Sequence, residues 1–351
     1  MKNINQYDLF KKISDKDYHF LQVTNNLNTY DEDYVIQIVF DYFRRKGFPH
    51  YEIQDGEKLR QMDKLISFNE LSLLDEDKIN QSMHGLRLAW SYFPHFWGVR
   101  CGNAKYTPLE IFKDDELFKK TILQTYKYCL KYEDNKMTMN RIRQSLKVYN
   151  GTQVVSNFRP TAAKLIYELF NTNGVVWDMS CGWGGRLLGA LSNFKIKTYI
   201  GTEPSTKTYE GLLNIKKDFN HIKNVEIFKI GSEDYLPDRN SLGLCFTSPP
   251  YFDTEKYSNE DTQSYIKYPS EYEWINGFML DTLKNCYYGL ENGGFLVLNI
   301  ANTSSAKKIE QGLMNIARQT GFKHIKTMRL ILSSISGAGC KYEPVYVFRK
   351  H

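Results

Sequence analysis

Residues 242–251 read Leu-Gly-Leu-Cys-Phe-Thr-Ser-Pro-Pro-Tyr, an apolar run that ends at two prolines. The apolar part has the length and composition of a buried parallel strand. Because Pro249 and Pro250 have no backbone N–H to donate, the strand must stop before them, and the residues around them are held extended. Ser248 to Tyr251 therefore form a stiff strand end that carries a hydroxyl, a carbonyl and an aromatic face. These groups suit a flat heterocycle with an amino group, although a plain turn with a buried tyrosine is an equal alternative for the stretch alone.

The chain around this stretch alternates strands and helices, which predicts an α/β fold with a mostly parallel sheet over residues 151–351. A turn signal at Asn150-Gly151 opens this part. Seven strands are expected, of which the last two are antiparallel because no helix separates them. We place them at residues 175–178, 197–203, 225–230, 242–246, 295–300, 323–332 and 342–349.

Residues 1–150 are predicted to form a separate, mainly helical domain. Apolar spacing typical of helices occurs at 34–43, 58–70 and 109–131. The aromatic-rich stretch 90–97 lies between two of them. Such a cluster can stack on unpaired bases, but a small apolar core is the favoured interpretation.

A second motif follows the first strand of the predicted sheet. Asp178 ends that strand, and the next six residues are Met-Ser-Cys-Gly-Trp-Gly, which lead into a helix. A glycine-rich turn lets the backbone approach a ligand closely. Glu203 ends the next strand, where a carboxylate suits ribose hydroxyls. The glycine spacing offers no pyrophosphate cradle, so it favours a ligand with a nucleoside and an amino-acid part; a purely structural turn is the alternative.

The composition is that of a soluble globular protein with a formal net charge of +6. No acidic residue occurs between Asn135 and Tyr167, which predicts either a phosphate-contacting surface or a solvated basic helix face. Arg141, Arg143, Lys147 and, further on, Lys256 are the candidates for nucleic-acid contacts. No apolar run approaches the ~18 residues of a membrane span, and no signal peptide is evident. Six scattered cysteines without metal-site spacing predict buried, reduced thiols, no bound metal and a cytoplasmic location.

Taken together, the motifs resemble those of the S-adenosylmethionine-dependent DNA amino-methyltransferases, which methylate cytosine at N4 or adenine at N6. Thr247–Tyr251 is similar to the family's catalytic motif, in its S-P-P-Y form, and Asp178–Gly184 to its methionine-binding loop. Phe158-Arg159-Pro160-Thr161 resembles the segment that closes over the methionine part of the cofactor. The resemblance covers residues 155–351. It implies the class I methyltransferase fold, a Rossmann-like seven-stranded sheet, here preceded by the mainly helical domain.

The resemblance also implies roles for individual residues. Ser248, Pro249, Pro250 and Tyr251 would be catalytic: the serine and the Pro249 carbonyl accept hydrogen bonds from the target amine, and the tyrosine stacks on the base. The cofactor would be bound by Phe158, Arg159, Thr161, Asp178, Ser180, Gly182, Gly184, Glu203, Ser248 and either Glu233 or Asp234. Serine in the catalytic motif favours cytosine over adenine, and a base in a duplex would have to be flipped out.

The expected function is site-specific DNA methylation in a bacterial or phage restriction-modification system, alone or beside a companion nuclease. Methylation of RNA or of another planar amine is an alternative, as is a non-catalytic nucleic-acid-binding subunit with the same fold. Target recognition is expected in residues 1–150 or in 252–268. We expect this second segment, polar and tyrosine-rich, to be mobile without substrate and to fold over the target base.

Overall fold

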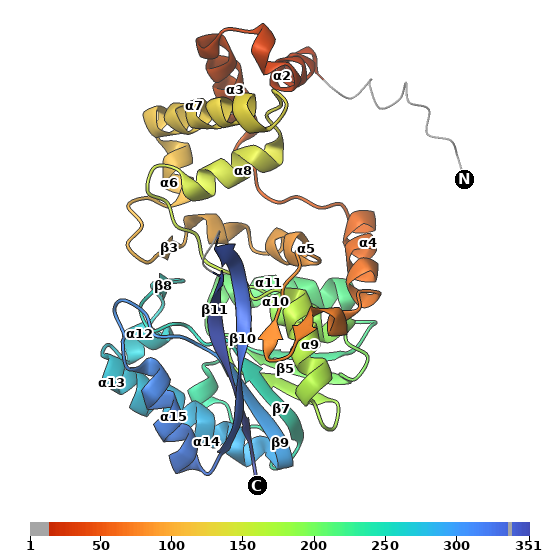
Figure 1. Cartoon of the computed structure of the whole chain (residues 1–351), viewed down its shortest axis with the longest axis vertical. Helices are drawn as coiled ribbons and strands as arrows, with labels where there is room; N and C mark the ends of the chain where they lie inside the picture. The colour runs from red at the N-terminus through yellow and green to blue at the C-terminus, as the bar shows by residue number, and fades with distance from the viewer. Residues whose placement is uncertain (1–13, 336–338) are drawn as a thin grey trace, which may run out of the picture. The chain divides into compact units, whose positions relative to one another are not determined.

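The computed structural model describes residues 14–335 and 339–351, and the chain forms two compact units (Figure 1). The first unit contains residues 14–50 and 97–154 of the described chain, and the second contains Tyr51–Phe96 and Val155–His351. This division differs from the predicted boundary near residue 150, because residues 51–96 belong to the second unit. None of the helices in the described ranges has the length and apolar character needed to cross a membrane.

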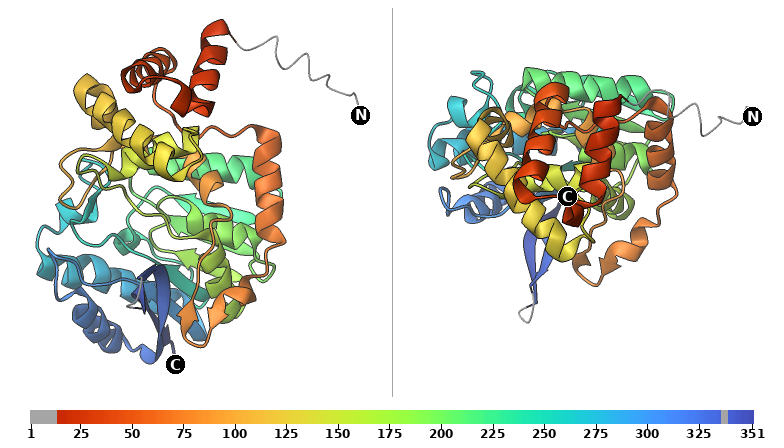
Figure 2. Two further views of the ribbon diagram at one scale, coloured as in Figure 1. Left: turned by 45° about the horizontal axis from the view of Figure 1, so that its top comes forward. Right: turned by 90° about the horizontal axis from the view of Figure 1, so that it is seen from above.

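The first unit is helical, as predicted, and Figure 2 shows its helices from two further directions. Its elements are α2 (Asp15–Asn25), η1 (Leu27–Thr29), α3 (Glu32–Lys46), β3 (Arg100–Cys101), α6 (Pro108–Lys113), α7 (Asp115–Tyr132) and α8 (Met139–Val148). Local signals set the helix ends: Thr107 and Glu110 form a capping box at α6, and α3 ends at Gly47, where φ is 89°. Val39, Phe43 and Phe118 are fully or almost fully buried in the core that these helices share.

The second unit is built on a sheet whose strands, in spatial order, are β1-β2-β10-β11-β9-β7-β4-β5-β6. Seven of them are the predicted strands: β4 (Val175–Asp178), β5 (Thr198–Thr202), β6 (Asn224–Phe228), β7 (Leu242–Thr247), β9 (Leu290–Asn299), β10 (Lys323–Ile335) and β11 (Gly339–Arg349). The strands from β9 to β6 are parallel, and β11 is antiparallel to both β9 and β10. The α/β fold, the seven strands and the antiparallel last pair are therefore confirmed.

Residues 51–96 extend this sheet at one edge. The segment contains α4 (Asp55–Ile66), η2 (Glu70–Leu73), β1 (Leu74–Asp75), β2 (Lys78–Ile79) and α5 (Leu86–Ser91), and η3 (Pro94–Gly98) follows. β2 pairs in parallel with β10, so two short strands are added at that edge. The aromatic-rich stretch is core, as favoured: Trp90, Phe93 and Phe96 are all buried.

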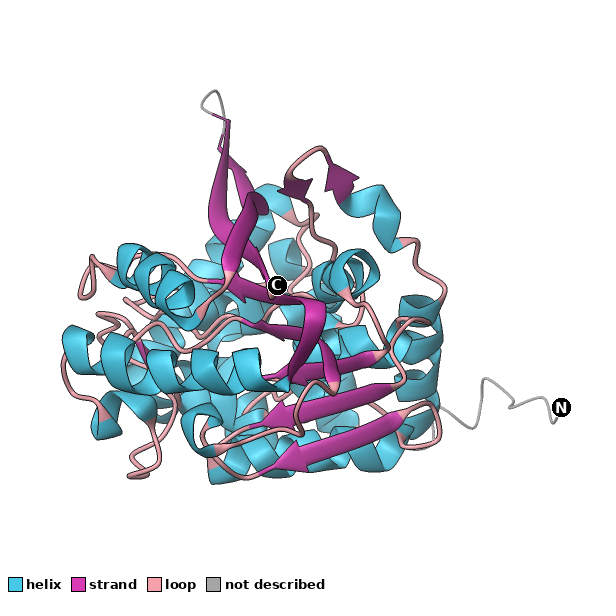
Figure 3. Cartoon of the chain, turned by 90° about the horizontal axis from the view of Figure 1, so that it is seen from below, coloured by secondary structure: helices cyan, strands magenta, loops and turns pink. Residues whose placement is uncertain are grey.

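Helices cover both faces of the sheet (Figure 3). They are α9 (Pro160–Phe170), α10 (Gly185–Ser192), α11 (Thr206–Phe219), η4 (Ser232–Asp234), α12 (Ser264–Lys267), α13 (Glu271–Glu273), the π-helical turn η5 (Trp274–Met279), α14 (Leu280–Gly289) and α15 (Ile309–Thr320), with the short strand β8 (Glu255–Lys256) before α12. Side chains alternate along β7, so Cys245 joins the core with η5, α14 and α15, whereas Phe246 meets Tyr167 of α9 edge-on at 5.5 Å. All six cysteines are free thiols and five are buried, as predicted.

Candidate functional site

The carboxyl ends of the five parallel strands border a cavity of about 220 Å³ in the second unit. Ligands bind at this edge in open α/β sheets, because the loops that leave neighbouring parallel strands meet there. From the predicted site the cavity is lined by Phe158, Ser180, Gly182, Glu203, Glu233, Ser248, Pro249, Pro250 and Tyr251. The two motifs that the sequence singled out therefore share one cavity.

The diproline motif is held rigidly at the end of β7. Ser248 is half-buried and Pro249 is buried. The Pro250 carbonyl accepts a hydrogen bond from the Phe252 N–H at 2.9 Å, which makes a tight turn centred on Tyr251. Phe252 itself has φ 54°, a left-handed conformation that is uncommon for a bulky residue. The Tyr251 hydroxyl donates to the Glu343 carboxylate at 2.9 Å. The side chain of Tyr251 is therefore held by the backbone turn at one end and by this hydrogen bond at the other.

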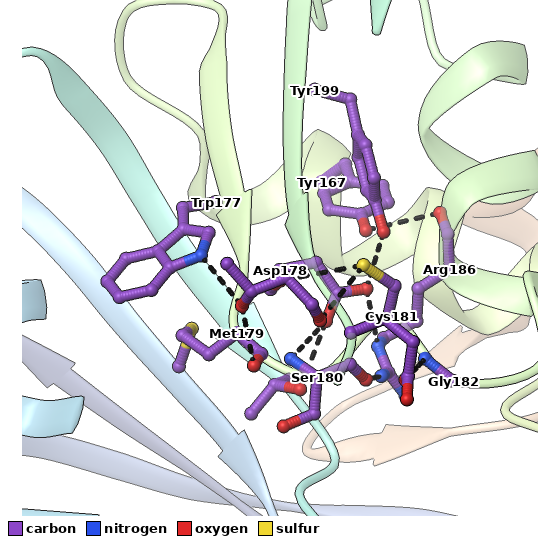
Figure 4. Close-up of polar contacts among 12 residues, drawn as sticks. Tyr167, Trp177, Asp178, Met179, Ser180, Cys181, Gly182, Arg186 and Tyr199 are labelled. Atoms are coloured by element: carbon purple, nitrogen blue, oxygen red, sulfur yellow. Dashed lines mark hydrogen bonds and ion pairs between the residues drawn. The ribbon is translucent and has the colours of Figure 1, made fainter. Parts of the chain in front are cut away.

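Asp178 lies behind the cavity rather than in its lining. Its carboxylate is fully buried: Oδ2 accepts from Arg186 Nε at 2.9 Å and from the Tyr199 hydroxyl at 2.7 Å (Figure 4). Its Oδ1 accepts from the Thr247 hydroxyl at 3.0 Å. Asp178 thus ties the residue before Ser248 to the glycine loop, and it is placed to hold the two motifs together rather than to touch a ligand.

The glycine loop and Glu203 form one hydrogen-bonded corner of the cavity. The Gly182 N–H donates to Glu203 Oε2 at 3.1 Å, and the Ser205 N–H donates to Oε1 at 3.0 Å. Burial raises the pKa of Glu203 to about 7, and the negative charge of Asp178 adds to the rise, whereas the two N–H donors oppose it. The Glu203 side chain therefore changes its charge near neutral pH.

Two carboxylates follow β6, and only one of them faces the cavity. Lys267 Nζ contacts Glu233 Oε1 at 2.5 Å and Asp234 Oδ2 at 2.7 Å. The Glu233 side chain is 3% exposed and lines the cavity, whereas that of Asp234 is 55% exposed. Within the part of the chain that the structure describes, Glu233 Oε2 has no hydrogen-bond partner. The geometry therefore distinguishes the two residues, which their spacing in the sequence did not.

Three other residues predicted at the site do not line the cavity but lie in or at the ends of the helices beside it. Gly184 is the N-cap of α10, with φ 72°. Thr161 is buried in α9 and accepts a hydrogen bond from the Ser82 N–H at 3.3 Å. Arg159 is the N-cap of α9, and burial lowers its pKa.

The four candidate nucleic-acid contacts do not form one group. Three lie on α8 of the first unit and are engaged there: Arg141 pairs with Glu133, and Arg143 Nε donates to the Pro49 carbonyl at 2.8 Å. The Lys147 ammonium group lies 4.9 Å from the centre of the Trp97 ring. Lys256 belongs to the second unit and is exposed.

The cavity also has polar lining residues that we did not predict from the sequence. Among them are Gln81, Asn157, Trp183, Arg186, Gln263, Asn299 and Glu343. Trp183 and Arg186 lie in or just after the glycine loop, so their position was a usable signal. Gln81 and Glu343 come from distant parts of the sequence, and only the tertiary fold brings them to this edge. Gln263 lies in the segment 252–268, which the sequence analysis linked to the target base and not to individual site residues. No three His, Cys, Asp or Glu side chains converge on a possible metal position in residues 14–335 and 339–351.

Neither the comparison with protein-family models nor that with curated proteins gave a match. Among solved structures, the chain is similar to a 4+2 cyclase (TM-score 0.39, 10% identity, 54% of this chain and 81% of that one). It is similar to a SAM-dependent methyltransferase from Methanosarcina mazei (TM-score 0.38, 12% identity, 53% and 96%). A third is magnesium protoporphyrin IX methyltransferase from Synechocystis with bound SAM (TM-score 0.37, 11% identity, 54% and 76%). The fold is the Rossmann-like fold of class I methyltransferases. Strand order and the antiparallel β11 carry that conclusion.

Proposed function

We propose that this protein is an S-adenosylmethionine-dependent methyltransferase that modifies an exocyclic amine of cytosine (N4) or adenine (N6) in DNA. One observation carries the proposal: the glycine loop with Glu203 and the Ser248–Tyr251 motif line the same cavity. Cofactor and target amine can meet only if their two sites are adjacent. The hydrogen bond from Thr247 to Asp178 fixes that adjacency.

The residues present suit the cofactor part by part. In the proposed complex, Ser180 and Gly182 border its amino-acid part, and the Glu203 carboxylate accepts hydrogen bonds from its ribose hydroxyls; all three residues line the cavity. Glu233 Oε2, buried and without a partner among the described residues, is an acceptor for the amino group of adenine. When bound, S-adenosylmethionine supplies an electrophilic methyl group on its sulfonium sulfur.

The diproline motif orients the amine that receives the methyl group. The Ser248 hydroxyl and the Pro249 carbonyl accept its two N–H bonds, which turns the nitrogen lone pair toward the cofactor side of the cavity. Tyr251 stacks on the base, with its ring fixed by the hydrogen bond to Glu343. Positioning supplies most of the rate enhancement in such a site, since hydrogen-bond acceptors are already aimed at the developing positive charge.

DNA is the proposed polymer because the S-P-P-Y form resembles that of DNA amino-methyltransferases. A base inside a duplex cannot reach a cavity at a sheet edge unless it leaves the stack, so the target is flipped out or single-stranded. In the proposed setting the protein acts in the cytoplasm of a bacterium or in a phage-infected cell, alone or beside a nuclease.

The test measures transfer of a labelled methyl group from S-adenosylmethionine to unmethylated genomic DNA and, in parallel, to total RNA. We expect label in DNA as N4-methylcytosine or N6-methyladenine. Ser248→Ala and Tyr251→Ala should each reduce transfer by about 100-fold or more, because each removes a group that orients the amine. Binding of S-adenosylhomocysteine by Tyr251→Ala should change less than about threefold, because none of the residues predicted to bind the cofactor is altered in that variant.

Two exposed residues of the second unit provide matched controls. Ser67, at the end of α4, and Tyr272, which is 75% exposed, lie outside the cavity. Ser67→Ala and Tyr272→Ala should leave transfer at the wild-type rate. If the label appeared only in RNA, the substrate would be RNA rather than DNA. A wild-type protein that binds no S-adenosylhomocysteine would end the proposal.

A further inference from the structure

Residues 260–267 form a short segment that contacts the loops after β5 and β6, which carry the predicted cofactor carboxylates Glu203 and Glu233. At its start, the Glu260 carboxylate accepts from the Thr206 N–H at 3.1 Å and from the Thr206 hydroxyl at 2.6 Å. At its end, Lys267 binds Glu233 and Asp234. Thr206 follows β5 and Glu233 follows β6, and these strands are neighbours in the sheet. Residues 260–267 are therefore anchored over the loops after β5 and β6.

Gln263 lies between these anchors and lines the cavity. Its side chain is 4% exposed, and its amide nitrogen has no hydrogen-bond partner in the described part of the chain. The Lys267 N–H donates to the Gln263 carbonyl at 3.0 Å, and Gln263 is the N-cap of the short helix α12, which ends at Lys267. Gln263 and Glu233 both line the cavity, and the helix that Gln263 begins is anchored to Glu233 through Lys267.

The lining of the cavity thus includes two buried groups with unused hydrogen-bonding capacity among the described residues, an acceptor (Glu233 Oε2) and a donor (Gln263 Nε2). An unpaired buried polar atom costs free energy, which a ligand with the opposite pattern recovers. Adenine has that pattern, since its amino group donates and the ring nitrogens beside it accept. Guanine and hypoxanthine carry an acceptor oxygen in place of the amine.

We propose that Gln263 recognises the adenine ring of the cofactor, together with Glu233, by donating to a ring nitrogen that flanks the amino group. The inference rests on the proposed function. It assigns the second half of the segment 252–268 to the cofactor, whereas the sequence suggested that the segment folds over the target base. Gln263 is then a specificity-determining residue for the cofactor's nucleoside.

The test is calorimetric binding of S-adenosylhomocysteine and of its 1-deaza and 7-deaza adenine analogues, each of which replaces one ring nitrogen by carbon. Wild-type protein should bind one of the analogues about 3- to 10-fold more weakly, as expected for one lost hydrogen bond. Gln263→Leu should weaken binding of S-adenosylhomocysteine by a similar factor and show no further loss with that analogue. Gln263→Glu should bind more weakly than Gln263→Leu, because it directs an acceptor at an acceptor.

Gln311→Leu, an exposed glutamine on α15, is the control and should bind all three ligands as the wild type does. The analogue series on the wild-type protein needs no variant, so a Gln263 variant that fails to fold does not block the test. Equal binding of all three ligands by the wild type, or unchanged binding by Gln263→Leu, overturns the inference and leaves the proposed function standing. Absence of any binding by the wild type overturns both.

Discussion

Asp178 illustrates how one buried carboxylate can connect two segments that line a cavity without lining it itself. Its oxygens accept from Arg186, Tyr199 and Thr247, and Arg186 is itself only 6% exposed. A buried charge that loses its partner is strongly destabilising. We therefore expect Asp178→Ala to lower the free energy of unfolding by about 3–5 kcal/mol in urea denaturation.

The control for this prediction is an exposed ion pair of the same unit. Asp281 contacts Lys284 at 2.8 Å, and both side chains are about half exposed. Asp281→Ala should change the free energy of unfolding by no more than about 1 kcal/mol, since water already solvates both charges. Equal losses for the two variants would mean that the buried pair has no special role.

From the raised pKa of Glu203 we predict that cofactor binding depends on pH. Its pKa of about 7 means that the ligand-free protein holds a neutral carboxyl below neutral pH. In the proposed complex both oxygens of the ionised carboxylate accept hydrogen bonds from the ribose hydroxyls, so affinity for S-adenosylhomocysteine should fall as pH drops from 8 to 6. The slope approaches about tenfold per pH unit below the pKa. Binding measured at pH 6, 7 and 8 tests this, and Glu203→Gln should bind weakly at all three.

Through Glu203, pH affects folding stability in the opposite direction to cofactor binding. The pKa of Glu203 in the folded protein lies above its ordinary value of 4.5, so the folded state binds this proton more tightly than the unfolded chain. The contribution to stability is fully present below about pH 4.5 and is lost as pH rises through about 7. At neutral pH this contribution of Glu203 to the stability of the ligand-free protein is therefore largely lost.

At the scale of elements, strands marked by apolar runs could be predicted closely. β4 matches its predicted bounds, and β7 extends its own by one residue. β9 begins at Leu290 rather than at 295, because its first residues include Glu291 and Asn292, which carry no strand signal. β1 and β2 have two residues each and exist only because β10 offers an edge. A pattern read locally cannot contain that information.

The glycine loop yields a prediction in which neighbouring glycines behave differently. A Cβ at Gly185 would lie 1.9 Å from the Phe158 carbonyl oxygen, whereas at Gly182 the nearest atom is 3.7 Å away. Gly182→Ala should cost about 1–2 kcal/mol for its φ of 53° alone. Gly185→Ala must separate the loop from the Phe158 segment, and we expect a loss of at least about 3 kcal/mol. Thermal unfolding of both variants tests this prediction. Equal decreases in Tm would refute the close approach of Gly185 to the Phe158 carbonyl oxygen.

At the scale of the whole molecule, the stretch without acidic residues is divided between the two units. Arg141, Arg143 and Lys147 lie in the first unit, and Arg159 and Lys164 lie in the second. Lys164 is 1% exposed, pairs with Glu70 at 3.0 Å and donates to three backbone carbonyls. Most of these cations are therefore used inside the fold, and a count of charges along the sequence could not distinguish such residues from a surface that contacts phosphates.

Each unit has its own apolar core, which leads to a prediction for the whole chain. Phe93 packs edge-on against Trp183 at 5.8 Å in the second unit, and Phe118 is buried among the helices of the first. Replacing either by alanine leaves a cavity, at a cost of about 3–5 kcal/mol. In hydrogen–deuterium exchange, Phe93→Ala should accelerate exchange mainly in residues 51–96 and 155–351, and Phe118→Ala mainly in 14–50 and 97–154. If exchange in residues 51–96 were instead accelerated by Phe118→Ala and not by Phe93→Ala, these residues would belong to the first unit. The predicted domain boundary near residue 150 would then describe the protein better than the division seen in its contacts.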